Sequence, residues 1–190
     1  MKIFLLDANK KMIEAWQEYF NTAKDVEMVH CYFNEFMETH PEIDAVVSPA
    51  NSFGLMDGGY DAAITEYFGK ELMKRVQETI VEKWRGEQPV GISLTVPIDE
   101  KRVLIHTPSM RTPEEIKDPR IIYQCMRTTL IEALNHGAEN ILIPAFGGRT
   151  GKVPYKTIAK MMFLAYEQVQ NPPAELNWRY ALGVARGLED

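Results

Sequence analysis

Short apolar runs alternate along the chain with longer stretches in which apolar residues recur every three or four positions. The short runs are bounded by polar or turn-forming residues, a pattern that is typical of buried strands. They predict six strands, at Lys2–Leu6, Val26–Phe33, Asp44–Ser48, Pro89–Val96, Arg102–Thr107 and Asn140–Phe146.

The longer stretches follow the period of an amphipathic helix. They predict helices over Met12–Phe20, Ala62–Gly69, Leu72–Trp84, Pro119–His136 and Pro154–Val169. Pro172 and Pro173 end the last of these helices, because proline cannot continue a helical hydrogen-bond ladder. The final segment, Glu175–Asp190, fits either a strand or a short helix.

Strands that alternate with helices predict an α/β domain with a largely parallel sheet. The chain has no internal repeat, low-complexity segment or long linker, and its 190 residues fit one domain or one domain with a tail. In such sheets ligands bind outside the carboxyl ends of the strands. We therefore look for the chemistry of this protein in the segments that directly follow the strands.

Two of those segments are rich in glycine. "SPANSFGLMDGGYDAAI" (Ser48–Ile64) follows the third predicted strand, and "GGRTGKVP" (Gly147–Pro154) follows the sixth. Glycine lets backbone N–H groups approach a ligand, and the helix that begins after each loop adds the positive end of its dipole. Two such loops on neighbouring strands would hold two linked phosphates. The alternative is that the glycines only make tight turns.

Two better-known phosphate motifs do not fit these loops. The spacing from Gly147 to Gly151 is one residue shorter than in a Walker loop, and Val153 takes the place of its magnesium-binding Ser or Thr. No G-x-G-x-x-G sequence follows the first strand, so the dinucleotide-binding fingerprint is absent as well.

Composition and charge narrow the classes of partner. The formal net charge of -6 disfavours a broad surface for nucleic acid or for an anionic membrane. Cys31 and Cys125 lie far apart without metal-ligand spacing, which favours free thiols in a reducing compartment. The apolar run Ile3–Leu6 is too short for a signal peptide or a membrane span. We expect a cytoplasmic protein without a metal or another cofactor.

The two glycine loops also carry a family resemblance. "VVSPANSFGLMDGGYDAAI" is similar to the strand, "NAAN" motif, glycine loop and "DGAI" motif of the macro domain family, which binds ADP-ribose and its derivatives. "ILIPAFGGRTGKVP" is similar to that family's strand, "PA", glycine loop and proline. The resemblance runs from about Ile43 to Val169, and "HTPSMRTP" and "MMFLAYEQ" suggest a divergent bacterial or phage branch.

The resemblance implies a three-layer α/β/α sandwich around a mixed, largely parallel sheet. We expect it to comprise residues 1–173, with residues 174–190 packed on the same domain. Asn51 matches the asparagine that contacts the distal ribose, and Asp61 matches the aspartate that helps to activate water in hydrolytic members. The candidate ligand-binding residues are Ala50, Asp57, Gly58, Gly59 and Tyr60 on the first loop and Phe146, Gly147, Gly148, Arg149, Thr150 and Gly151 on the second, with Phe33 and Asn34 as candidates for the adenine side.

The chain departs from the family pattern at several of these positions. Ser48 replaces the family's first asparagine, Asp57 puts a carboxylate near the expected anion, and Thr65 stands where some hydrolases have histidine. Gly148-Arg149 replaces a Ser or Thr before the loop glycine, so Arg149 can add a cation near the phosphates. The acidic residue that commonly follows the second strand and meets adenine is not found.

These observations leave several functions open. The leading one is binding of an ADP-ribose-type small molecule or of an ADP-ribosylated protein, with hydrolysis at the distal ribose as a candidate activity. The alternatives are a non-catalytic binding module and an RNA binder, which the acidic charge disfavours. Asp61 has a second reading as a partner of the helix dipole. His106 lies in an apolar strand and is interpreted as a core residue, while Arg111 fits either a pocket mouth or a solvated turn. The sequence leaves the oligomeric state open.

Overall fold

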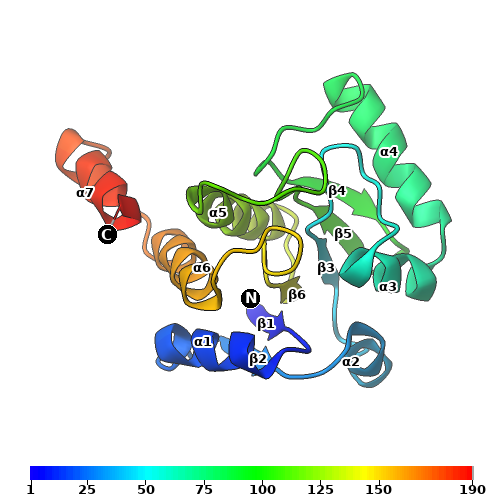
Figure 1. Cartoon of the computed structure of the whole chain (residues 1–190), viewed down its shortest axis with the longest axis horizontal. Coiled ribbons are helices and arrows are strands. Elements are labelled where there is room, and N and C mark those ends of the chain that lie inside the picture. Colours follow the sequence, from blue (N-terminus) through cyan, green and yellow to red (C-terminus); the bar gives the residue numbers. More distant parts are fainter. Residues whose placement is uncertain (190) are drawn as a thin grey trace.

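The fold was obtained as a computed structural model that describes residues 1–189 (Figure 1). Within these residues the chain forms six strands and seven helices. The strands are β1 (Lys2–Leu6), β2 (Val26–Val29), β3 (Ala45–Ser48), β4 (Leu94–Pro97), β5 (Val103–His106) and β6 (Asn140–Pro144). The helices are α1 (Lys10–Phe20), α2 (Phe33–Thr39), α3 (Gly59–Phe68), α4 (Glu71–Trp84), α5 (Arg120–Asn135), α6 (Tyr155–Gln170) and α7 (Trp178–Glu189).

All six strands belong to one sheet with the order β2-β1-β6-β3-β5-β4. The pairs β1–β2, β1–β6, β3–β6 and β3–β5 are parallel, and only the edge strand β4 runs antiparallel to its neighbour. The expected mixed, largely parallel sheet is therefore confirmed. β1, β6 and β3 lie in its middle, and the carboxyl ends of these three parallel strands share one edge.

Helices cover both faces of the sheet and make the three layers of an α/β/α sandwich (Figure 1). Along β1, Ile3 and Leu5 face one hydrophobic core, whereas Phe4 and Leu6 face the other, as the two-residue period of a strand requires. The first core contains the buried faces of α1, α5 and α6. The second contains those of α2, α3 and α4. Both faces of the central strands are dry, which explains their continuous apolar sequences.

The second predicted strand was too long. β2 ends at Val29, and Phe33, placed in that strand by the sequence pattern, is the first residue of α2. Phe33, Phe36 and Met37 are buried at helical spacing in the second core. The backbone N–H of Tyr32 bonds the Glu35 carboxylate at 3.4 Å, which helps to start the helix. α2 has only seven residues and three buried apolar positions. A segment this short does not show enough of the hydrophobic pattern to distinguish a helix from a strand.

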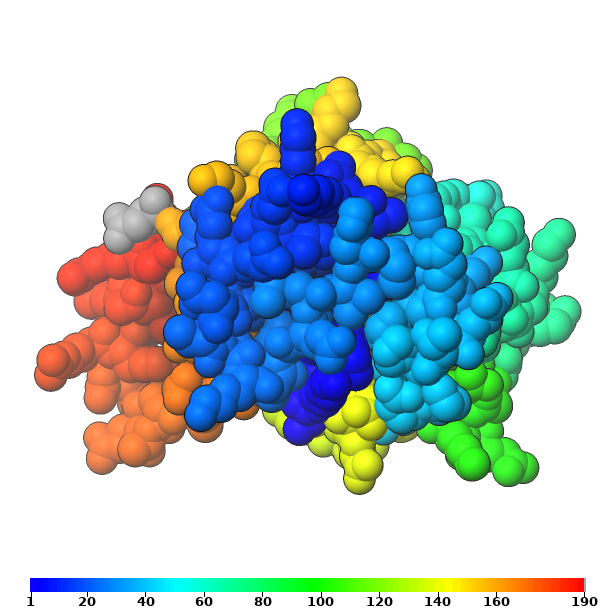
Figure 2. All heavy atoms as spheres, turned by 90° about the horizontal axis from the view of Figure 1, so that it is seen from below, coloured from blue at the N-terminus to red at the C-terminus, as the bar shows by residue number. Residues whose placement is uncertain are grey.

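Two other segments can be compared with the prediction: the start of the fourth strand differs from it, and the segment after Pro173, which was left open, is now assigned. Residues 89–93 precede β4 instead of forming part of it. The open segment after Pro173 is helical: α7 contacts α6 and lies at one end of the molecule (Figure 2). Gln168 Nε2 of α6 donates to Tyr180 Oη of α7 at 2.7 Å. The boundary at residue 173 stays a prediction, and position 190 lies outside the described residues.

Candidate functional site

The two glycine loops meet at the carboxyl edge of the sheet. The first follows β3 and the second follows β6, and these two strands are hydrogen-bonded neighbours. A Cβ atom placed on Gly59 in the first loop would lie 3.5 Å from Arg149 Nη1 of the second loop. The expectation that both loops come from neighbouring strands is confirmed. The exposed guanidinium group of Arg149 reaches across to the start of α3.

The first loop is shaped by Asn51. Its Oδ1 accepts from the backbone N–H groups of Phe53 at 3.1 Å and Leu55 at 3.3 Å, and its Nδ2 donates to the Leu55 carbonyl at 2.9 Å. The residue is only 7% exposed. In this conformation the side-chain amide of Asn51 therefore organises the turn. Ala50, next to it, is buried in the second core.

The first turn of α3 offers backbone donors to the outside. Asp57, Gly58 and Gly59 are exposed, and Gly58 is the N-cap residue without a capping side chain. The first N–H groups of a helix have no partner inside the helix, and they lie at the positive end of its dipole. Gly59 has a φ of 56°, which a residue with a Cβ atom rarely adopts. Free backbone N–H groups at the positive end of a helix favour a nearby anion, whereas Asp57 places a negative charge beside this turn.

Asp61 lies in the same first turn of α3 and is partly buried. Ser48 Oγ, at the end of β3, donates to Asp61 Oδ1 at 2.6 Å. Burial raises the pKa of Asp61 to about 7, although the Ser48 hydrogen bond acts in the opposite direction. A carboxyl group that titrates near neutral pH can both give and accept a proton. Ser48, which replaces the family's first asparagine, is thus the direct partner of the candidate base.

Tyr60 connects the first loop to α2. Its ring packs edge-on against Phe33 with 5.4 Å between the ring centroids. Its hydroxyl is buried without a hydrogen-bond partner among residues 1–189, and burial raises the tyrosine pKa well above its ordinary value. Phe33 itself is 3% exposed and belongs to the core, whereas Asn34 lies exposed on α2. The structure does not bring these two adenine-side candidates to the surface together.

The second loop is folded tightly on itself. Gly147 has a φ of 77°, and its carbonyl accepts from Val153 N at 3.2 Å. A Cβ atom on Gly151 would lie 2.6 Å from that same carbonyl oxygen, so only glycine fits. Phe146 is fully buried, Gly148 is half-buried, and Arg149 and Thr150 are exposed. Of the candidates on this loop, Arg149 and Thr150 present their side chains outward.

Asp7 is a site residue that the sequence reasoning missed. It follows β1, the strand on the other side of β6, so its carboxylate stands at the same edge as the two loops. Its Oδ1 accepts from Asn9 N at 2.7 Å. Burial raises the Asp7 pKa, while the positive field of Arg149 and His30 acts to lower it. An acidic residue directly after the first strand was the available signal, but the central place of that strand was not known.

The fold and these loops agree with the comparisons to known proteins. The sequence model of the Macro domain matches residues 47–162. The chain belongs to the macro domain family. An uncharacterized protein of Aquifex aeolicus is 28% identical over 126 residues, covering 65% of this chain and 73% of its own. The Oceanobacillus iheyensis macrodomain with ADP is similar in fold, with a TM-score of 0.60 and 21% identity over 78% of this chain and 84% of that one. The DarG macrodomain of Mycobacterium tuberculosis has a TM-score of 0.58 and 15% identity over 67% and 84%.

The matched part of this macro domain contains both glycine loops, whereas Asp7, the strands β1 and β2, and the helices α1, α2 and α7 lie outside it. The candidate site therefore combines two loops inside the family match with Asp7, which lies outside it.

The remaining candidates in the macro domain have structural partners. His106 is buried, its Nδ1 lies 2.6 Å from Gln88 Oε1, and burial lowers its pKa to about 3, as expected of a core residue. Arg111 is exposed and makes two hydrogen bonds to Glu87, at 2.6 and 3.1 Å. Thr65 Oγ1 donates to the Met56 carbonyl at 3.1 Å and ties the loop to α3.

Among residues 1–189, no cluster of three or more His, Cys, Asp or Glu side chains is arranged to hold a metal ion. Within the same residues, no helix has the length and apolar character needed to cross a membrane. Cys31 is partly exposed and Cys125 is buried, and both thiols are free.

Proposed function

We propose that this macro domain binds ADP-ribose or a closely related derivative. The observation that carries the proposal is the meeting of two glycine loops around the Arg149 guanidinium group. Exposed N–H groups of the α3 N-terminus and a cation from the opposite loop are the donors that a diphosphate needs. The diphosphate then lies between the loops, and the distal ribose lies toward Asn51 and Asp61.

Relatives in the family support this ligand. The Oceanobacillus iheyensis macrodomain has structures with ADP and, for a glycine-to-valine variant, with ADPR, that is, ADP-ribose. A Trypanosoma brucei macrodomain is also found with ADP. Three Oceanobacillus variants replace an asparagine, a glycine and an aspartate that lie seven and then three positions apart. Asn51, Gly58 and Asp61 have the same spacing.

We further propose that the bound derivative is hydrolysed at C1″ of the distal ribose. Asp61 accepts a proton from a water molecule while the oxygen of that water bonds C1″, and the C1″ substituent leaves with the bond's electrons. Asp61 suits this role because its pKa of about 7 leaves a large fraction ionised at neutral pH. Ser48 holds its carboxylate in place. The substrate classes are ADP-ribosylated protein, O-acetyl-ADP-ribose and ADP-ribose 1″-phosphate.

Binding is tested by thermal unfolding and calorimetry with ADP-ribose, ADP and AMP. A ligand at about 100 times its dissociation constant should add roughly 2.7 kcal/mol, or about 5–11 °C. We expect the largest shift for ADP-ribose, because only it reaches the distal-ribose end. Equal shifts of the unfolding temperature for ADP and ADP-ribose would mean that Asn51 and Asp61 make no contact with the distal ribose. The absence of a shift with any of the three ligands would contradict the proposed ligand class.

Turnover separates the enzyme from a binding module. Asp61→Asn should keep ADP-ribose binding while removing hydrolysis of the three substrate classes. If the unchanged protein binds ADP-ribose tightly and releases no product from any of them, the domain is a reader of the ligand instead of a hydrolase.

A further inference from the structure

The charged side chains around the two glycine loops are unevenly distributed. On the β1 side of the site, burial raises the pKa of Asp7 while the positive field of Arg149 acts to lower it. On the β3 side, burial is the main cause of the raised pKa of Asp61, and the negative field of Asp57 adds to it. From Ser48 to Phe68 the chain has no Lys, Arg or His, so the first loop and α3 supply no cationic side chain. The end of the site that contains Asp61 is therefore its more negative end.

Asp57 is held beside this end by its two neighbours in the chain. Met56 is fully buried in the second core, and its carbonyl accepts from Thr65 Oγ1 at 3.1 Å. The Gly58 carbonyl accepts from Ala62 N at 3.3 Å and starts the hydrogen bonds of α3. Asp57 itself is exposed and makes no ion pair with any of residues 1–189. Its backbone is thus fixed at the start of α3, while its carboxylate is available to a ligand.

Arg111 lies against the first loop, but its charge is already paired. The carbon of its guanidinium group is 5.6 Å from the centre of the Phe53 ring. The same group makes two hydrogen bonds to the Glu87 carboxylate. A guanidinium group and a carboxylate joined in this way have no net charge together. Arg111 therefore does not balance the charge of Asp57.

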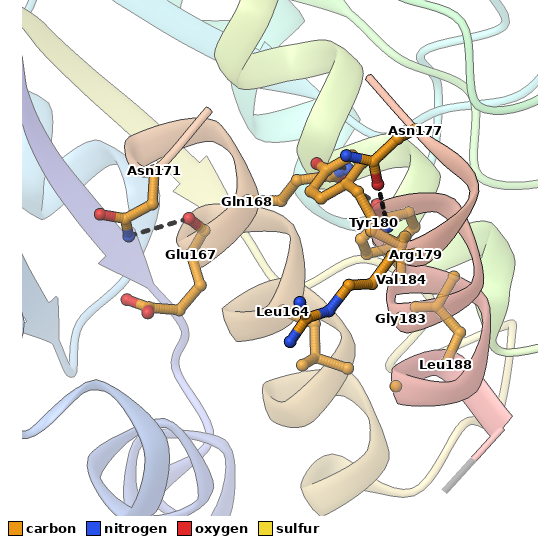
Figure 3. Close-up of a pocket in the computed structure, with 12 residues that line it drawn as sticks. Leu164, Glu167, Gln168, Asn171, Asn177, Arg179, Tyr180, Gly183, Val184 and Leu188 are labelled. Atoms are coloured by element: carbon orange, nitrogen blue, oxygen red, sulfur yellow. Dashed lines mark hydrogen bonds between the residues drawn. The ribbon is translucent and has the colours of Figure 1, made fainter. Parts of the chain in front are cut away.

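A groove of about 850 Å³ between α6 and α7 is separate from this site (Figure 3). None of its lining residues belongs to either glycine loop. A group attached to the distal ribose is therefore expected to meet the charges of the first loop and not this groove.

We propose that Asp57 selects the charge of the group on C1″ of the distal ribose. A guanidinium group, as in ADP-ribosylated arginine, is bound more tightly than the uncharged hydroxyl of ADP-ribose, and a 1″-phosphate is bound most weakly. The inference rests on the proposed function, which puts the distal ribose toward Asn51 and Asp61. A carboxylate makes strong hydrogen bonds to a guanidinium group and repels a phosphate. Among the substrate classes named above, this order favours ADP-ribosylated protein over ADP-ribose 1″-phosphate.

Calorimetry with three ligands that differ in the group on C1″ tests this order. The ligands are ADP-ribose 1″-phosphate, ADP-ribose, and the ADP-ribosyl derivative of N-acetylarginine amide. The Asp61→Asn protein is used so that no ligand is hydrolysed during the measurement. We expect the affinity to rise in the order given, by roughly two- to fivefold at each step, which is the range for exposed charge pairs.

A second substitution in the Asp61→Asn protein tests the assignment to Asp57. Asp57→Asn should remove most of both steps. Any effect of Asp57 on the diphosphate is common to the three ligands, so the ratios of their affinities isolate its effect at C1″. The matched control is Glu66→Gln, an exposed acid of α3 that also makes no ion pair with any of residues 1–189, and it should leave both steps unchanged. Raising the ionic strength from about 0.05 to about 0.5 M should shrink the steps, because salt screens exposed charges.

The outcomes separate this inference from the proposed function. Equal affinities for the three ligands, or tightest binding of the 1″-phosphate, would overturn the charge preference and leave the ADP-ribose site in place. Steps that survive Asp57→Asn would overturn the assignment to this residue. If thermal unfolding shows a folded protein that binds none of the three ligands, the proposed function fails, and the charge preference fails with it.

Discussion

The two glycine loops have the same sequence plan, a strand, glycines and a helix, but they use glycine for different reasons. In the first loop, a Cβ atom on Gly58 would meet no atom within 4 Å, and the residue is exposed. In the second loop, a Cβ atom on Gly151 would collide with the backbone of Gly147. The first loop therefore has open space beside Gly58, whereas the second loop is packed tightly against itself at Gly151. Packing therefore requires glycine at position 151 of the second loop but not at position 58 of the first.

The largest expected effect that tests this contrast is in the second loop. Gly151→Ala forces a side chain to within 2.6 Å of a backbone oxygen and should destabilise the fold by about 1–3 kcal/mol. The unfolding temperature should therefore fall by roughly 2–12 °C. Gly58→Ala, its counterpart in the first loop, should change the free energy of unfolding by no more than about 0.5 kcal/mol. Equal losses in both variants would remove the distinction between the loops.

The second effect concerns Arg149, whose guanidinium group reaches from the second loop to the first. Arg149→Ala should weaken ADP-ribose binding by roughly 10- to 100-fold, since hydrogen bonds to charged groups contribute about 1.5–3 kcal/mol. The unfolding temperature without ligand should hardly change, because Arg149 is exposed. Lys152→Ala, another exposed cation of the same loop that is paired with Glu115, is the matched control. Calorimetry that finds the same affinity loss for both variants would point to general charge instead of the Arg149 position.

A third prediction sharpens the functional side of the contrast. Gly58→Ala leaves the chain unstrained, with a φ of -134°, but adds a methyl group where the proposed phosphate approaches the α3 N-terminus. We expect the affinity for ADP-ribose to fall about tenfold, roughly 1.4 kcal/mol, with unfolding unchanged. Undiminished affinity in calorimetry would mean that the ligand does not approach the backbone at this residue.

The same contrast explains how far sequence alone could reach. The strands around each loop and the pairing of loops on adjacent strands were predictable from apolar runs and from the resemblance. The roles within the loops were not. The residue type of Asn51 is compatible with a ligand contact. The sequence does not show, however, that its amide closes a turn with Phe53 and Leu55. Phe146 and Phe33 look the same in sequence whether they face a pocket or, as here, the core.

Long-range placement set the other limit. Asp7 stands at the site only because β1 pairs with β6, a contact between residues more than a hundred positions apart. Ser48 looked like a lost asparagine, yet it holds Asp61 because α3 turns back over the end of β3. Such neighbours depend on strand order, which no local pattern encodes.

The smallest expected effect concerns Asp61, the partly buried acid that follows the first loop. Its folded pKa of about 7 lies above the ordinary value of 3.8. Protonated Asp61 therefore favours the folded state, so its contribution is fully present below about pH 4 and is lost as the pH rises through 7. Asp61→Asn removes the charge that burial opposes but keeps the shape. The side chain is partly exposed, and the variant should gain only about 1 kcal/mol, or roughly 2–4 °C, at pH 8. At pH 5 the two proteins should unfold within a degree or so of each other. A stability difference that does not depend on pH would mean that Asp61 titrates normally, and the argument for it as a base at neutral pH would then rest on its position beside Ser48 alone.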